Sequence, residues 1–173
     1  ENYRELPAKN EARKLFSLPD EKFIIVNIAR LHLHQKAQGV LADALVKLLS
    51  RGINAHLVLV GEGPDRTRLK NIIERAGMKE SVTFLGTTNK IPEILAAADV
   101  FALSSAYEGF GIVVAEALAA GVPVVSTRCG GPEEILDGGK FGRLVPVNNP
   151  AAMADVIEEL AGNKAERNRL SAL

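Results

Sequence analysis

The sequence predicts a single α/β domain with a Rossmann-like, doubly wound parallel sheet. Short apolar segments rich in Val and Ile alternate along the chain with segments of helical spacing. Glycine and proline punctuate these segments where turns and helix ends are needed. The 173 residues, 47% of them hydrophobic, are enough for one domain with a sizeable core. Strict alternation of strand and helix implies a parallel sheet with helices on both faces.

The first half of the chain is predicted to contain three strands. Residues 1–20 are polar, and we interpret them as a linker with one short helix around Lys9 to Phe16. The folded domain is then expected to cover residues 21–173. Apolar runs rich in β-branched residues predict strands. Apolar residues three or four positions apart, as in residues 40–49, predict helices. The predicted strands are 23–28, 56–60 and 82–85, and the predicted helices are 40–49, 64–77 and 91–97.

The second half of the chain repeats the pattern. The predicted strands are 100–103, 122–126 and 144–147, and the predicted helices are 111–121, 132–136 and 150–160, the last strong one. Ligands of such sheets bind at the carboxyl ends of the strands. We therefore expect functional residues on the loops 30–36, 61–64, 86–90, 104–111 and 127–132.

One acid interrupts an apolar helix. From Ile112 to Ala120 every residue except Glu116 is apolar, and a helix that is apolar all round is normally buried. A buried carboxylate is costly without hydrogen-bond donors. A pair of sugar or ribose hydroxyls is one candidate partner. Contact with solvent at a helix edge, or with a core arginine, is the alternative.

Two cations and a glycine-rich turn suit a phosphate ligand. Arg30 and Lys36 follow the first strong strand, and Arg and Lys both bind phosphate oxygens. Gly109-Phe110-Gly111 opens a helix, whose first N–H groups are unpaired and favour anions. Glu108 lies just before this turn. The alternative interpretations are solvated surface cations, a plain glycine turn and an acid that stabilises the helix dipole.

Composition and missing motifs exclude several classes. The net charge is zero, which gives no electrostatic argument for nucleic-acid binding. Cys129 is the only cysteine, so no internal disulfide forms, which fits a reducing compartment. The dinucleotide fingerprint fails at Arg66, where it needs glycine. No Asp-x-Asp occurs, and His32 and His34 lack a third ligand, so we predict no metal site.

Several segments in order resemble one family. The segment EGFGIVVAE, from Glu108 to Glu116, has two acids in the spacing typical of retaining glycosyltransferases of the GT-B fold, family 4 (glycosyl transferases group 1). The resemblance extends from about Phe23 to Ala161. The other segments that carry it are IARL with Lys36, LVLVGEGPDR, VTFLG, ADVFALSS, EALAAGVPVV and GGPEEILDGGKFGRLV.

The resemblance implies that this chain is one half of a two-domain enzyme. Members of this family have two Rossmann-like domains across a cleft, and this chain is similar to the C-terminal, donor-binding one. The acceptor-binding N-terminal half, and the final helix that crosses back onto it, would lie outside the chain. The resemblance implies a cytoplasmic enzyme, with room for a peripheral position at the inner face of the membrane. No cofactor is implied beyond the nucleotide-sugar substrate.

The resemblance also implies roles. Arg30 and Lys36 would neutralise the donor diphosphate. Glu108 would contact the transferred sugar and Glu116 the ribose, while the base would lie beside residues 84–87. The implied catalytic residues are Glu108, Arg30 and Lys36, and the implied donor-binding residues are Gly109, Phe110, Gly111, Ile112, Val113, Glu116, Leu85 and Thr87.

Two positions depart from the family pattern. Ala29 and Ala37 stand where the family commonly has glycine.

The reaction that the resemblance implies is metal-independent transfer of a hexose, with retention, to a glycan or lipid-linked glycan. The chain alone is expected to be inactive. A nucleotide-sugar epimerase of the same fold and a non-catalytic binding module are the alternatives.

Overall fold

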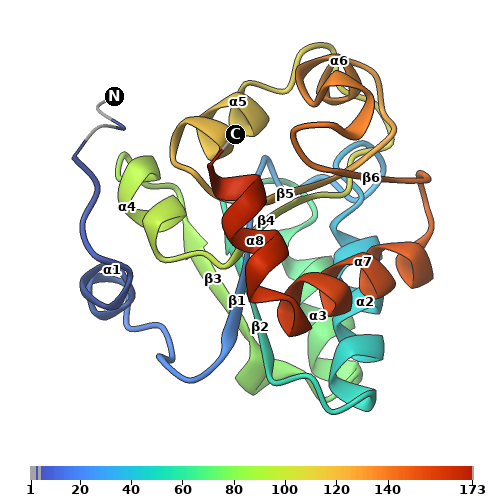
Figure 1. Ribbon diagram of the computed structural model, residues 1–173. Coiled ribbons are helices and arrows are strands. Elements are labelled where there is room, and N and C mark those ends of the chain that lie inside the picture. Colours follow the sequence, from blue (N-terminus) through green and yellow to red (C-terminus); the bar gives the residue numbers. More distant parts are fainter. Residues whose placement is uncertain (1–2, 4, 173) are drawn as a thin grey trace.

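A parallel six-stranded sheet lies between two layers of helices (Figure 1). The computed structural model describes residue 3 and residues 5–172. The strand order is β3-β2-β1-β4-β5-β6, which confirms the predicted doubly wound α/β domain. The strands are β1 (Phe23–Ile28), β2 (Ala55–Val60), β3 (Val82–Gly86), β4 (Val100–Leu103), β5 (Val124–Thr127) and β6 (Arg143–Val145).

Alternate residues of each central strand face opposite helix layers. In β1, Ile25 packs with one core cluster, whereas Ile24 and Val26 pack with the other. One layer consists of α2 (Gln38–Ser50), α3 (Arg66–Arg75), α7 (Pro150–Gly162) and α8 (Lys164–Ser171). The other consists of α1 (Lys9–Leu15), α4 (Ile91–Ala96), α5 (Ile112–Ala119) and α6 (Gly131–Ile135). Two short 3₁₀ turns, η1 (Lys79–Ser81) and η2 (Asp137–Gly139), complete the elements. Over the described residues, no helix is both long and apolar enough to cross a bilayer.

The chain reverses its winding direction between β1 and β4. β1 pairs with β2 on one side and with β4 on the other, all in parallel. The loops that follow β1 and β4 therefore leave the same edge of the sheet side by side. This is the position at which doubly wound sheets bind their ligands.

Two predicted strands are shorter than expected, and one helix was missed. β5 begins at Val124 instead of Val122, and β6 ends at Val145, beyond which Val147 is 39% exposed. Helix α8 was missed because its residues are mostly polar. The Asn163 side chain accepts a hydrogen bond from the Glu166 N–H, and this N-cap was the available signal.

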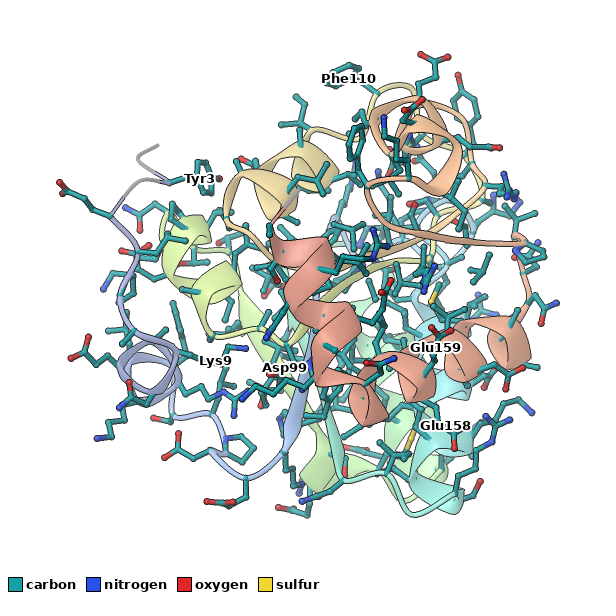
Figure 2. All side chains as sticks on the ribbon, in the orientation of Figure 1. Tyr3, Lys9, Asp99, Phe110, Glu158 and Glu159 are labelled. Carbon is teal, nitrogen blue, oxygen red and sulfur yellow. The ribbon has the colours of Figure 1, made fainter. Side chains whose placement is uncertain are left out.

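The first helix packs onto the domain. Ala12 of α1 is fully buried, and the guanidinium of Arg13 bonds to Asp99 at 2.6 Å and to the Ala97 carbonyl at 3.2 Å. Lys9 reaches the other oxygen of Asp99 at 2.9 Å (Figure 2). The short helix predicted inside the segment 1–20 is therefore part of the packed unit.

Candidate functional site

A cavity of about 450 Å³ opens at the carboxyl ends of β1 and β4. The loop after β1 supplies one wall, and the turn before α5 supplies the other. Most of the predicted site residues meet here. Its lining consists of Ile28, Ala29, Arg30, Lys36, Glu108, Phe110, Gly111, Ile112 and Val113.

A larger hollow of about 800 Å³ lies between α1 and α4. Its charged lining residues are the three acids Glu5, Glu11 and Glu93, with no cation among them. An anionic ligand is repelled by such a surface. The smaller cavity is the one whose chemistry suits a phosphate.

Lys36 and Glu108 form an ion pair across the cavity. The Lys36 ammonium contacts Glu108 Oε1, and the two side chains are 20% and 11% exposed. The same oxygen accepts a hydrogen bond from Ser105 Oγ at 2.8 Å. In the described part of the chain, Glu108 Oε2 has no hydrogen bond and the exposed Arg30 guanidinium has no partner. One carboxylate oxygen and one guanidinium therefore remain available to a ligand.

The loop that carries Arg30 and Lys36 is held in place by hydrogen bonds to two side chains. Gln38 is fully buried; its amide donates to the Arg30 carbonyl at 2.9 Å and accepts from the His32 N–H at 3.3 Å. Asp65 accepts the Leu33 N–H at 2.8 Å. These bonds order the backbone between the two cations, which reduces the entropy lost when a ligand binds.

Ala37 adopts the left-handed conformation, with φ of 50° and ψ of 39°. A residue with a side chain is strained in this region by roughly 1–2 kcal/mol, whereas glycine is not. This conformation gives a physical reason why glycine would be favoured at this position. Lys36 precedes this residue, so the strain lies directly beside the site.

The glycine-rich turn is fastened to the loop after β5. The Glu108 N–H donates to the Cys129 carbonyl at 2.8 Å, and the Gly131 N–H donates to the Glu108 carbonyl at 3.1 Å. A Cβ on Gly131 would lie 2.4 Å from the Phe110 carbonyl oxygen, so only glycine fits there. Burial raises the pKa of the Cys129 thiol, which keeps it protonated beneath the turn.

Helix α5 begins at the cavity. Gly111 precedes it with φ of +84°, and the Val114 N–H donates back to the Gly111 carbonyl at 2.8 Å. The N–H groups ahead of Val114 have no partner within the helix. They and the helix dipole favour a negative charge in the cavity.

The expected burial of α5 is wrong. Val114 and Ala117 are its buried residues, whereas Ile112 is 65% exposed. Glu116 is partly exposed and, among residues 5–172, its carboxylate has no hydrogen bond or ion pair. The helix packs on the sheet along one stripe only, because its outer face borders the cavity and solvent. The solvent contact weighed as an alternative for Glu116 is what the structure shows.

The remaining predicted residues lie outside this lining. Gly109 is exposed on the turn itself. Leu85 lies in β3 and packs against the core, while Thr87 follows that strand and is exposed. Since β3 is at the sheet edge and is separated from β4 by β1 and β2, a base held there would lie beyond those two strands.

Phe110 is part of the cavity lining, is 63% exposed and projects outward from the turn (Figure 2).

Sequence reasoning missed the residues that hold the site. Gln38, Ser104, Ser105 and Thr127 are all fully buried polar residues around the cavity. Ser104 and Ser105 directly follow β4. Two polar residues at the carboxyl end of a fully apolar strand were a readable signal, because buried hydroxyls need partners.

The arrangement places two cations, a helix N-terminus and one carboxylate around a single cavity. The profile of the family described as Glycosyl transferases group 1 matches residues 8–172. The chain belongs to this family. As a glycosyl transferase group 1 domain, it corresponds to the C-terminal half of the GT-B fold.

Relatives of this glycosyl transferase domain are longer than the chain. It is 32% identical over 167 residues to N-acetyl-alpha-D-glucosaminyl L-malate synthase of Bacillus anthracis, covering 93% of this chain and 43% of that protein. It is 36% identical over 162 residues to a GDP-mannose-dependent alpha-(1-6)-phosphatidylinositol monomannoside mannosyltransferase of Mycobacterium tuberculosis, covering 88% and 42%.

Among solved structures, Anabaena Alr3699/HepE in complex with UDP matches with a TM-score of 0.87 at 27% identity, covering 96% of this chain and 47% of that one. The chain thus spans less than half the length of each of these three relatives.

Proposed function

We propose that this chain is the donor-binding half of a retaining glycosyltransferase that moves a hexose from a nucleoside-diphosphate sugar to a glycan or lipid-linked glycan. The observation that carries the proposal is the cavity shared by Arg30, Lys36, Glu108 and the N-terminus of α5. This set matches a donor that presents two phosphates beside a polyhydroxylated ring.

The cations and the helix act on the leaving group. When the bond between the sugar and the diphosphate breaks, negative charge develops on the departing phosphate oxygens. Arg30 and Lys36 neutralise that charge, and the N–H groups at residues 109–112 donate hydrogen bonds to it or to the sugar. Preorganised donors of this kind supply much of the rate enhancement in such reactions. A metal ion is not needed for this role.

The two acids orient the donor. Glu108 accepts hydrogen bonds from hydroxyls of the transferred sugar through its unengaged Oε2, and Glu116 accepts them from the ribose. A carboxylate with a free oxygen is a strong acceptor for a hydroxyl. Val113 packs beside the nucleotide, and Leu85 and Thr87 flank the base.

The relatives support a nucleotide-sugar ligand. Anabaena Alr3699/HepE was crystallised in complex with UDP, and in a second structure with UDP and glucose. The second structure is 28% identical in sequence to this chain. The Mycobacterium tuberculosis relative is GDP-mannose-dependent. Since the bases differ among relatives, the base used by this chain has to be measured.

Calorimetry with UDP, GDP and ADP tests the proposal. We expect one of the three to bind at micromolar to millimolar concentration. The Lys36→Met variant should bind it more weakly, because a charge that faces the phosphates is gone. Absence of binding by all three nucleotides at millimolar concentration contradicts the proposal.

A further inference from the structure

Two adjacent serines separate β4 from the site. Ser104 and Ser105 are both fully buried, and their hydroxyls bond to different loops. Ser104 Oγ donates to the Lys36 carbonyl at 2.8 Å. Ser105 Oγ donates to Glu108 Oε1 at 2.8 Å. One serine therefore holds the backbone of the cation, and the other holds the side chain of the acid.

Ser105 is itself fixed by its neighbours. Its carbonyl accepts a hydrogen bond from the buried Thr127 hydroxyl at 2.6 Å, which ties it to β5. The next residue, Ala106, donates its N–H to the Gln35 carbonyl at 2.8 Å, which ties the same segment to the Lys36 loop. A hydroxyl so constrained, on a buried strand end, sets the position of the carboxylate it bonds to.

Lys36 and Ser105 share one oxygen of Glu108, and this sharing has a consequence when a ligand arrives. A diphosphate carries more negative charge than one carboxylate and attracts the Lys36 ammonium away from Glu108. The Ser105 hydroxyl is then the remaining donor to Oε1 among the described residues. It keeps the carboxylate in place, with Oε2 directed to a sugar hydroxyl.

We propose that Ser105 is a positioning residue that orients Glu108 toward the donor sugar, and that Ser104 is its counterpart for the Lys36 loop. This inference rests on the proposed function, because it assigns the two serines to the same donor site. Ser105 then contributes to the binding free energy of the sugar, and Ser104 to that of the diphosphate.

The test compares Ser105→Ala with Ser104→Ala by calorimetry, using two probe pairs: UDP with UDP-glucose, and GDP with GDP-mannose. For the pair that binds, the measured quantity is the ratio of the two dissociation constants. Ser105→Ala should keep the affinity for the nucleoside diphosphate within about twofold. It should lower the affinity for the sugar nucleotide, relative to the nucleoside diphosphate, by roughly 3- to 10-fold, the size of one ordinary hydrogen bond.

Ser104→Ala should weaken both members of the pair by the same factor and leave the ratio unchanged. A purely structural role of Ser105 would make Ser105→Ala weaken both ligands by the same factor, as expected for Ser104→Ala. Ser105→Cys covers the case in which Ser105→Ala does not fold, since it keeps the volume and replaces a strong donor by a weak one. It should lose the sugar preference as Ser105→Ala does.

The outcomes separate the two proposals. If the unmodified chain binds neither ADP nor any of the four probes, the proposed function fails and this inference fails with it. If it binds the nucleoside diphosphate but the Ser105 variants keep the wild-type ratio, only the assignment of Ser105 is overturned.

Discussion

Lys36 is the charged group most directly tied to the proposed chemistry. Replacing it with Met removes a cation that lies at the cavity and leaves the Glu108 carboxylate without its ion-pair partner. We expect the affinity for the nucleotide that binds to fall by about 10- to 100-fold, as for loss of a hydrogen bond between charged groups. Calorimetry measures this. Lys70→Met, on the exposed face of α3, is the matched control and should bind normally.

Glu116 is a partly exposed acid without an internal partner in the described chain. Glu116→Gln should leave the melting temperature unchanged within a few degrees, because no buried contact is lost. If Glu116 binds the ribose, the variant should weaken UDP binding by roughly 3- to 10-fold and 2′-deoxy-UDP binding much less; GDP and 2′-deoxy-GDP serve if the chain prefers guanine. An equal loss for both nucleotides would show that Glu116 does not contact the 2′-hydroxyl.

Among individual residues, the sequence predicts the charged residues of the site better than the buried polar residues that position them. Arg30, Lys36 and Glu108 follow strands, and parallel strands end at one edge, so their convergence follows from the pattern. The burial of Glu116 was mispredicted because an apolar sequence does not reveal how many sides of a helix are covered. Ser105 was missed because its partner oxygen belongs to a side chain whose rotamer depends on the folded turn.

The start of α2 contains a strained residue. Ala37 is buried with φ of 50°, so Ala37→Gly relieves roughly 1–2 kcal/mol of strain, offset by about 0.5–1 kcal/mol of added chain entropy. We expect the free energy of unfolding to rise by up to about 1.5 kcal/mol. Ala42→Gly, at a buried position inside the same helix, should lower it by about 1 kcal/mol. Denaturant unfolding of both variants compares the two signs; a loss of stability in both would contradict the strain.

The β2–β3 pair contains a histidine that folding keeps neutral. Burial, and secondarily the charge of Lys22, lower the pKa of His56 from 6.5 to about 4. The unfolded chain therefore binds more protons between these values, and stability falls as pH drops from 6.5 to 4, by at most about 1.4 kcal/mol per pH unit. Unfolding measured across this range should show a shallower slope for His56→Gln, which can keep a hydrogen bond to Thr83. Equal slopes would rule out His56 as the source.

Elements with strong apolar periodicity were predicted well, and polar ones were not. β1 and β4 match the prediction to the residue, since both are largely buried and consist mostly of Ile, Val, Phe and Leu. α8 escaped prediction because its stability comes from one buried leucine, Leu170, and from ion pairs such as Arg143–Glu166 at 2.9 Å. Such contacts join distant parts of the chain and leave little periodic trace.

The whole molecule should bind a donor without transferring its sugar. A nucleotide at 100 times its dissociation constant should raise the free energy of unfolding by about 2.7 kcal/mol, seen as a higher melting temperature. Release of nucleoside diphosphate from the corresponding sugar nucleotide should stay at the buffer level, because the proposed function assigns this chain only the donor-binding half of the reaction. Sustained release by the purified chain would contradict this.

Strand order is the property of the whole molecule that the sequence did not specify. Alternating strands and helices imply a parallel sheet, but the reversal between β1 and β4 depends on which strand β4 joins. That pairing is what places Lys36 against Glu108. The residue pattern alone leaves other strand orders open.

The outward Phe110 ring has a practical consequence. The chain contains no tryptophan, and Phe110 stands at the mouth of the cavity with 63% of its surface free. An indole placed there would be the sole strong emitter in the molecule. Its fluorescence would report a ligand that enters the cavity, without any attached dye.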